Sequence, residues 1–162
     1  MSCFTFDSSW TTARSIIIDA SPDQVYATLS DVPQWPQWDD GLVSASLDVP
    51  NVIANGAEGT LVMKERGTFR FTLNDIDPAD YFAYDTALKG VDAHWFWAYG
   101  TETEAGVVLE IGVTFRGWLA SWYKYWLEKE CNEAFERCCQ NLKRIIEGRA
   151  VVMAQTSTNR HI

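Results

Sequence analysis

Six consecutive segments between residues 42 and 115 alternate apolar and polar side chains, and this pattern constrains the fold more than any other feature. They lie near residues 42–49, 58–66, 68–76, 80–88, 92–100 and 106–115. A period of two is typical of β-strands with one buried face. Turn-forming stretches such as D-P-A-D and T-E-T-E-A-G separate the segments. The sequence therefore predicts an antiparallel meander of six strands.

The alternation also predicts which side chains face the core. In the last segment, one face carries only large apolar residues: Val107, Leu109, Ile111, Val113 and Phe115. The same reasoning turns Phe69, Phe71 and Leu73 inward. The segment at 92–100 places Trp95, Trp97 and Tyr99 on one face, with His94 and Phe96 on the other. Both of its faces carry aromatic rings, so the alternation separates its inner and outer faces less clearly than in the other segments.

A strand near residues 14–20 and two short helices are expected before the meander. Ser21, Pro22 and Gln24 form the N-terminal signature of a helix, with Gln24 completing a capping box. The segment V-P-Q-W-P-Q-W follows, and its two prolines limit any second helix to a turn or two. Trp35 and Trp38 lie three residues apart in this segment, on one side of the turn.

A long helix is expected from about residue 118 to residue 147. It starts in the aromatic stretch G-W-L-A-S-W-Y-K-Y-W-L-E-K-E, and its apolar stripe rotates between the two halves. We expect the second half to be core. We expect the first half to overhang a cavity, with Tyr123 and Trp126 turned inward. Gly148 is the expected end of the helix. One domain is expected over 12–148, with an N-terminal extension at 1–11 and a flexible tail at 149–162.

Charge and composition exclude several classes of function. The net charge of −9 repels phosphate backbones, so no nucleic-acid partner is expected. No segment has the ~18 apolar residues of a membrane span, so no stable membrane insertion is expected. No signal peptide is visible in M-S-C-F-T-F-D-S-S-W, and the expected location is cytoplasmic. The four cysteines, Cys3, Cys131, Cys138 and Cys139, are expected to be reduced and mostly buried.

Several motifs in this order resemble the START-like, helix-grip (SRPBCC) superfamily, in particular its polyketide cyclase/dehydrase-like members. They are I-D-A-S-P-D-Q-V-Y-A-T-L-S-D-V-P-Q-W-P-Q-W-D, G-x-x-G-T at Gly56–Thr60, F-R-F-T-L-N-D-I-D-P-A-D-Y-F and N-L-K-R-I-I-E-G. The resemblance implies an α+β fold in which a curved antiparallel sheet of about seven strands wraps around the long C-terminal helix. It also implies a deep, mostly apolar cavity between sheet and helix. Members of the superfamily bind lipids, sterols, polyketides or quinones, so the fold implies a cavity and leaves the reaction open.

The candidate ligand-binding residues combine aromatic rings with a few polar groups that could point into such a cavity. They are Trp35, Trp38, Met63, Phe71, Tyr84, Trp95, Trp97, Tyr99, Tyr123, Trp126 and Glu130. Plain core packing is the alternative for every ring among them. Glu65 and Tyr84 are the only candidates for a catalytic role. Exposure at the rim is the alternative for both glutamates.

No cofactor and no metal site are expected. His94 lies on the outer face and His161 in the tail, and the cysteines lack zinc-ligand spacing. The favoured function is binding of a small hydrophobic molecule, which is a lipid, an aromatic polyketide or a quinone-like compound, in a cavity between the sheet and the C-terminal helix of a monomer or homodimer. One alternative is a cofactor-free cyclase or dehydratase, and whether the protein is an enzyme is left open. Another is an interaction module that uses Trp118, Trp122 and Tyr125.

Overall fold

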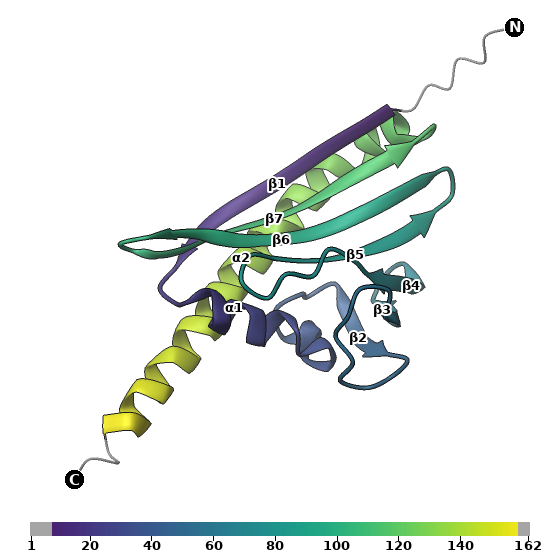
Figure 1. Cartoon of the computed structure of the whole chain (residues 1–162). Helices are drawn as coiled ribbons and strands as arrows, with labels where there is room; N and C mark the ends of the chain where they lie inside the picture. Colours follow the sequence, from purple (N-terminus) through teal and green to yellow (C-terminus); the bar gives the residue numbers. More distant parts are fainter. Residues whose placement is uncertain (1–7, 159–162) are drawn as a thin grey trace, which may run out of the picture.

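The computed structural model describes residues 8–158, which form a seven-stranded antiparallel sheet and a long helix that crosses it (Figure 1). The sheet order is β1-β7-β6-β5-β4-β3-β2. The strands are β1 (Ser8–Ile18), β2 (Leu42–Leu47), β3 (Glu58–Met63), β4 (Gly67–Leu73), β5 (Tyr81–Leu88), β6 (Val91–Thr103) and β7 (Gly106–Gly117). The helices are α1 (Pro22–Leu29), the 3-10 helix η1 (Val32–Gln37) and α2 (Ala120–Thr158). The expected helix-grip architecture is confirmed.

The six predicted meander strands are all present, and each pairs with its neighbour in sequence. The five inner residues of β7 show at most 1% exposure, which confirms the face predicted from the alternation. Strand β3 ends at Met63, earlier than expected, because residues 64–66 turn into β4. Strand β6 continues to Thr103, longer than expected.

Strand β1 closes the sheet by pairing with the last strand, with Ser8 opposite Gly117 and Ile18 opposite Val107. The prediction places this strand at residues 14–20, whereas in the structure it begins at Ser8 and ends at Ile18. Residues 8–11, expected in an N-terminal extension, belong to the sheet, and residues 1–7 lie outside the described part. The missed signal is weak alternation: S-S-W-T-T-A-R is mostly polar because one face of this edge strand is exposed.

The two short helices lead from β1 to β2. The capping box of α1 is present: the Gln24 amide N–H donates to Ser21 Oγ at 3.4 Å, and the Ser21 amide N–H donates to Gln24 Oε1 at 2.9 Å. Helix η1 buries Trp35, whose indole N–H donates to the carbonyl of Leu29 at 2.8 Å. The Trp35 ring stacks on Tyr84 at 5.4 Å and lies 5.5 Å from Phe71. This aromatic cluster anchors the short helices to the sheet.

Helix α2 has 39 residues and spans about 58 Å at 1.5 Å per residue. Its buried stripe starts at Cys131 and runs through Phe135, Cys138 and Leu142 to Ile146, so the expected core role of the second half is confirmed. Before Cys131, only Ala120 is buried.

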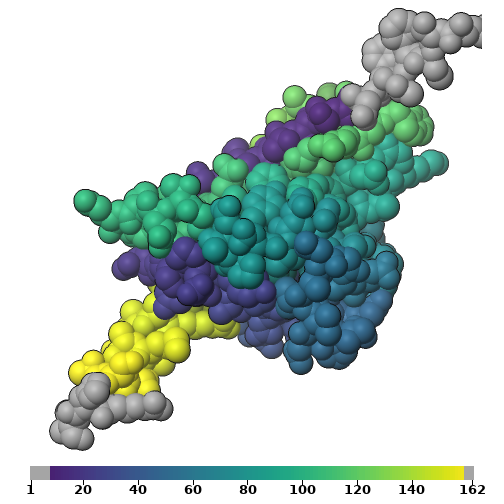
Figure 2. Space-filling view, in the orientation of Figure 1, coloured from purple at the N-terminus to yellow at the C-terminus, as the bar shows by residue number. Residues whose placement is uncertain are grey.

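The expected end of the helix at Gly148 is wrong. Residues 149–158 continue α2, and its last turns project away from the body of the molecule (Figure 2). Gly148 does not adopt the positive φ of a C′ glycine. Glu147, Arg149 and Ala150 around it favour helix, which offsets the cost of about 1 kcal/mol for one interior glycine. Residues 159–162 of the expected tail, including His161, lie outside the described residues.

Candidate functional site

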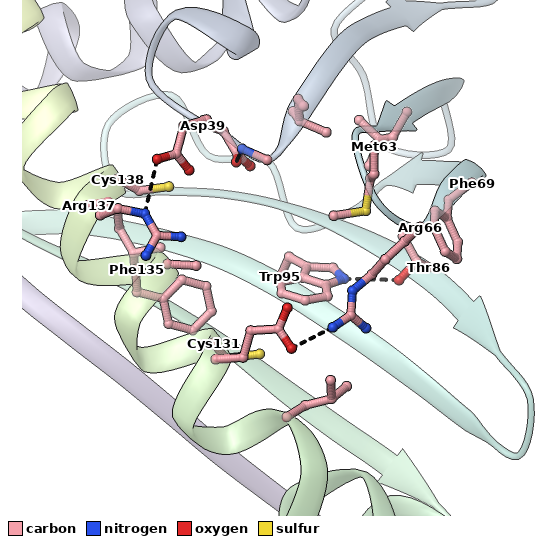
Figure 3. A pocket seen from close by; sticks show the side chains of 18 of the residues that line it. Asp39, Met63, Arg66, Phe69, Thr86, Trp95, Cys131, Phe135, Arg137 and Cys138 are labelled. Atoms are coloured by element: carbon pink, nitrogen blue, oxygen red, sulfur yellow. Dashed lines mark hydrogen bonds and ion pairs between the residues drawn. The ribbon is translucent and has the colours of Figure 1, made fainter.

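A cavity of about 440 Å³ lies between the inner face of the sheet and the buried face of α2 (Figure 3). Strands β3–β7 and the start of β2 supply one wall, and Leu127 to Cys138 of α2 supply the other. Its apolar lining comes from both walls: Leu42, Leu61, Met63, Phe69, Leu88, Trp95, Trp97, Ile111, Phe115, Leu127, Ala134 and Phe135. Size and lining are those of a small-molecule site.

Two tryptophans of β6 shape the aromatic wall. The indole N–H of Trp95 donates to Thr86 Oγ1 at 2.9 Å, and its ring meets Phe135 of α2 edge-on at 6.3 Å. Trp97 is buried two residues further along, and its indole N–H has no hydrogen-bond partner among residues 8–158. The two rings are in place because β6 turns every second residue toward the helix.

Tyr84 of β5 brings a hydroxyl into this apolar lining. The residue is only 7% exposed, and its hydroxyl has no hydrogen-bond partner among the residues that the structure describes. Burial raises the pKa of Tyr84 well above its usual value, and the nearby Asp39 and Cys138 raise it further. Tyr84 therefore stays protonated at any physiological pH and can donate a hydrogen bond into the cavity.

Asp39 follows Trp38 at the end of η1 and also lines the cavity. Its Oδ1 accepts the backbone N–H of Gly41 at 3.0 Å. Burial raises the pKa of Asp39 above its ordinary value, and neighbouring Asp40 adds to the rise, against the lowering effects of the Gly41 N–H, Arg137 and Lys64. A half-buried carboxyl and a protonated hydroxyl on the wall of one cavity can serve a ligand as a base and as a hydrogen-bond donor.

Charged side chains surround the opening of the cavity. We call this opening the mouth; its exposed lining residues are Asp40, Lys64, Glu65, Arg66, Glu130 and Arg137. Arg66 pairs with Glu130 of α2 at 2.5 Å, and Arg137 of α2 pairs with Asp40 at 3.0 Å. Figure 3 shows Asp39, Arg137 and Cys138 at one end of the pocket, and Arg66, Met63 and Phe69 toward the other.

The structure brings about half of the candidate residues to the cavity. Met63, Tyr84, Trp95, Trp97 and Glu130 line it. Trp35, Trp38, Phe71 and Tyr99 lie in the core instead, away from the cavity wall. The Tyr99 hydroxyl donates to the backbone carbonyls of Asp77 and Pro78, both at 3.2 Å. Of the two catalytic candidates, Tyr84 is buried, whereas Glu65 is an exposed residue of the β3–β4 turn at the mouth.

The expected inward turn of Trp126 is wrong. Its side chain is 61% exposed, and Trp118, Trp122 and Tyr125 around it are exposed as well. Tyr123 is partly buried, but it stacks on Phe115 at 6.1 Å and donates to the backbone carbonyl of Lys89, outside the cavity. The expected overhang fails because the helix meets the cavity only from Leu127 onward.

Several lining residues were missed from the sequence. Cys131, Phe135 and Cys138 follow each other at spacings of four and three residues on one face of α2. That spacing predicts an apolar stripe that faces inward, but the same spacing is found in stripes that pack in the core and in stripes that line a cavity. Asp39 had a usable signal: a carboxylate directly after two buried tryptophans of a short helix is held close to the core.

Other expected features can be located in the structure. His94 lies on the sheet face opposite the cavity, 2.5 Å from Asp85 and 3.2 Å from the Tyr81 hydroxyl. Cys131, Cys138 and Cys139 are buried free thiols, as expected, and Cys3 lies outside the described residues. Across residues 8–158 no three His, Cys, Asp or Glu side chains gather as metal ligands would. Within the same range, no helix has the length and apolar character needed to cross a membrane.

A cavity held between a curved antiparallel sheet and a C-terminal helix defines a helix-grip protein. Residues 9–147 match the family described as "Polyketide cyclase / dehydrase and lipid transport". The chain belongs to this family, which confirms the resemblance seen in the sequence. No curated protein matches the chain in sequence.

Solved structures share the fold at low identity. The di-domain ARO/CYC StfQ of the steffimycin biosynthetic pathway matches with a TM-score of 0.71 and 15% identity over 88% of this chain. This chain spans about half of that protein, at 52% of its length. The Zhui aromatase/cyclase of Streptomyces sp. R1128 gives the same TM-score and identity, with 88% and 96% of the two chains covered. Norcoclaurine synthase of Thalictrum flavum, in complex with dopamine and hydroxybenzaldehyde, matches at 0.67 and 8%, over 86% and 87%.

Proposed function

We propose that the protein binds a small, flat hydrophobic molecule in the cavity between the sheet and α2. The observation that carries the proposal is the cavity itself: about 440 Å³, walled by Trp95, Trp97, Phe115 and Phe135. Aromatic walls favour ring-containing ligands because stacked and edge-on rings attract each other beyond simple burial. An aromatic polyketide-like or quinone-like molecule therefore suits the lining better than a saturated lipid chain.

The size of the cavity supports measurable affinity. A two-ring ligand that buries about 300 Å² of apolar surface gains on the order of 7 kcal/mol. Loss of translational and rotational freedom costs at least about 4 kcal/mol. The remainder of about 3 kcal/mol corresponds to a dissociation constant of several mM. Two aromatic contacts with the cavity wall, at about 0.5–1.5 kcal/mol each, bring it to about 1 mM or below, which a titration would detect. The names of two similar structures support the same ligand class: one is an aromatase/cyclase, and the other holds dopamine and hydroxybenzaldehyde.

The test is a fluorescence titration with 2,3-dimethyl-1,4-naphthoquinone, which has no ring position free for thiol addition. Quinones quench tryptophan, and Trp95 and Trp97 lie in the cavity wall. We expect the quenching to saturate, with one quinone molecule bound per protein molecule. Competition by oleate would assign the site to lipids instead of flat rings. Extraction of the purified protein followed by mass spectrometry tests the same proposal with whatever apolar molecule the protein retains.

A matched pair of variants on α2 places the binding site. Ala134→Phe adds a ring inside the cavity, whereas Ala154→Phe adds the same ring at an exposed position of the same helix. We expect Ala134→Phe to weaken quinone binding at least tenfold and Ala154→Phe to leave it unchanged. Equal affinity of the two variants would contradict a ligand site in the cavity.

A further inference from the structure

Apolar ligand binding leaves two groups of the cavity unexplained, the Tyr84 hydroxyl and the Asp39 carboxyl. The Tyr84 hydroxyl makes no hydrogen bond to residues 8–158, and it is open to the cavity, because the buried side-chain atoms without a partner in this range are the indole nitrogens of Trp38 and Trp97. Tyr84 is nevertheless packed tightly, with its ring 5.4 Å from Phe71 and 5.7 Å from Trp97. Its hydroxyl is therefore held in one position on the cavity wall.

The Asp39 carboxyl is held by its own turn. Its Oδ1 accepts the Gly41 N–H, and no other hydrogen bond to this carboxyl is made by residues 8–158. The two nearby basic groups are committed elsewhere or exposed: Arg137 pairs with Asp40, and Lys64 lies at the mouth. Oδ2 is left available to a ligand. Among the acidic residues that line the cavity, only Asp39 is half-buried, whereas Asp40, Glu65 and Glu130 are exposed.

We propose that Asp39 removes a proton from the carbon next to the carbonyl group of a planar ketone held in the cavity, and that Tyr84 donates a hydrogen bond to the oxygen of that carbonyl group. The inference rests on the proposed function, because the same apolar walls must hold the ketone. It adds an activity, enolisation, to the binding site.

The step needs no cofactor. The Asp39 carboxylate takes a proton from the α-carbon, and the electrons of the broken C–H bond form a C=C bond. The electrons of the C=O double bond move to the oxygen, where the Tyr84 O–H donates a hydrogen bond to the developing negative charge. Return of a proton from Asp39 to carbon restores the ketone. When the proton on Asp39 has exchanged with solvent, the α-carbon acquires a solvent proton.

The surroundings assign the two roles. Burial raises the pKa of Asp39, which makes its carboxylate a stronger base than an exposed aspartate. Burial also keeps Tyr84 protonated, so it acts as a hydrogen-bond donor. Cys138 lines the same cavity, and burial raises its pKa far above the ordinary thiol value, so it supplies no competing base.

The test measures deuterium exchange at the α-carbons of 2-tetralone in heavy water, by mass spectrometry. We expect wild-type protein to accelerate exchange with saturation in ketone. Asp39→Asn should lower this acceleration at least about 100-fold, the usual contribution of a general base. Tyr84→Phe should lower it at least tenfold. Asp92→Asn, an exposed aspartate of β6 that does not line the cavity, is the control and should match wild type.

Binding is measured on the same samples by displacement of the quinone. Asp39→Asn and Tyr84→Phe should still bind 2-tetralone within about threefold of wild type, since the apolar walls are intact. Binding without faster exchange in the wild type would overturn the inference and leave the proposed function standing. Exchange that survives Asp39→Asn would overturn it as well. Failure to bind the quinone and 2-tetralone would contradict both.

Discussion

Arg66 and Glu130 form an ion pair of 2.5 Å across the mouth of the cavity. Arg66 lies in the β3–β4 turn, and Glu130 lies on α2 one turn after the exposed Trp126. The pair joins two elements that are 64 residues apart in sequence. A second pair, Arg137–Asp40, joins α2 to the chain after η1. Access to the cavity therefore depends on contacts that are charged and exposed to solvent.

Breaking the first pair should change the rate of ligand exchange more than stability. An exposed ion pair contributes about 0–1 kcal/mol, so Arg66→Gln should shift the free energy of unfolding by less than about 1 kcal/mol. The dissociation rate of the quinone, measured by stopped-flow fluorescence, should rise several-fold because the turn is no longer tied to the helix. Lys129→Gln removes an exposed pair outside the cavity and is the control. Equal dissociation rates in the two variants would show that the ion pair at the mouth does not control ligand release.

Replacement of Asp39 by asparagine should stabilise the protein at neutral pH. Burial raises the folded-state pKa of Asp39 above the unfolded value near 3.8. The folded protein thus retains this proton at a pH where the unfolded chain has lost it, and stability falls as the pH rises from 3.8 through the folded-state pKa. Asparagine carries no charge and can still accept the Gly41 N–H.

Thermal unfolding of wild type and Asp39→Asn between pH 3.5 and 7.5 tests this expected pH dependence of stability. The variant should have the higher Tm at pH 7, and the difference should shrink toward pH 3.5. Asp40, Lys64, Arg137, Tyr84 and Cys138 face Asp39 and are the same in both proteins. A lower Tm for the variant at pH 7 would show that the carboxylate is stabilised in place.

Replacement of Gly148 by alanine should stabilise the protein, because Gly148 lies in the interior of α2. A Cβ at Gly148 would meet no atom within 4 Å, so Gly148→Ala should stabilise the protein by about 0.5–1 kcal/mol. Gly59→Ala is the contrast: its Cβ would fall 2.4 Å from the Phe71 ring and also against the backbone carbonyl of Ser46. That substitution should cost about 1–3 kcal/mol. Urea unfolding measures both, and loss of stability in Gly148→Ala would contradict helix beyond residue 148.

The buried thiols should react slowly, and ligand should slow two of them further. Burial raises the pKa of Cys131 to about 11 and that of Cys139 to about 12. In a Cys3→Ser background at pH 8, thiolate is scarce, and reaction with Ellman's reagent should be on the order of 100-fold slower than in urea. Bound quinone should protect Cys131 and Cys138, which line the cavity, more than Cys139, which does not. Mass spectrometry of the modified sites distinguishes them, and equal protection of all three would contradict the site.

Much of the fold could be predicted because its cause is local. The alternation Val107 to Phe115 and the capping box at Ser21 depend on neighbours within a few residues. The ends of the elements were less predictable, as at Gly148, where a helix end depends on small differences between local preferences. Residues 8–11 are strand because β7 pairs with them, and that partner lies about a hundred residues away.

The site was harder to predict than the fold. Trp35 and Trp97 have the same chemistry, yet the former fills the core and the latter lines the cavity. Trp35 packs against Phe71 and Tyr84 of the sheet, whereas Trp97 faces the cavity, and both surroundings come from segments far away in the sequence. Trp126 shows the same limit. A ring on an apolar helical stripe predicts burial only where another element reaches that stripe, and here the sheet does not.

The pairing of β1 with β7 has a consequence for how the chain is made. Strands β2 to β7 each find a partner next to them in sequence, so they can pair as they leave the ribosome. Strand β1 is synthesised first but has no partner until residue 117 has followed, and α2, which covers the inner face, comes later still. Ile16 and Ile18 of β1 therefore stay uncovered in the nascent protein until β7 has been synthesised.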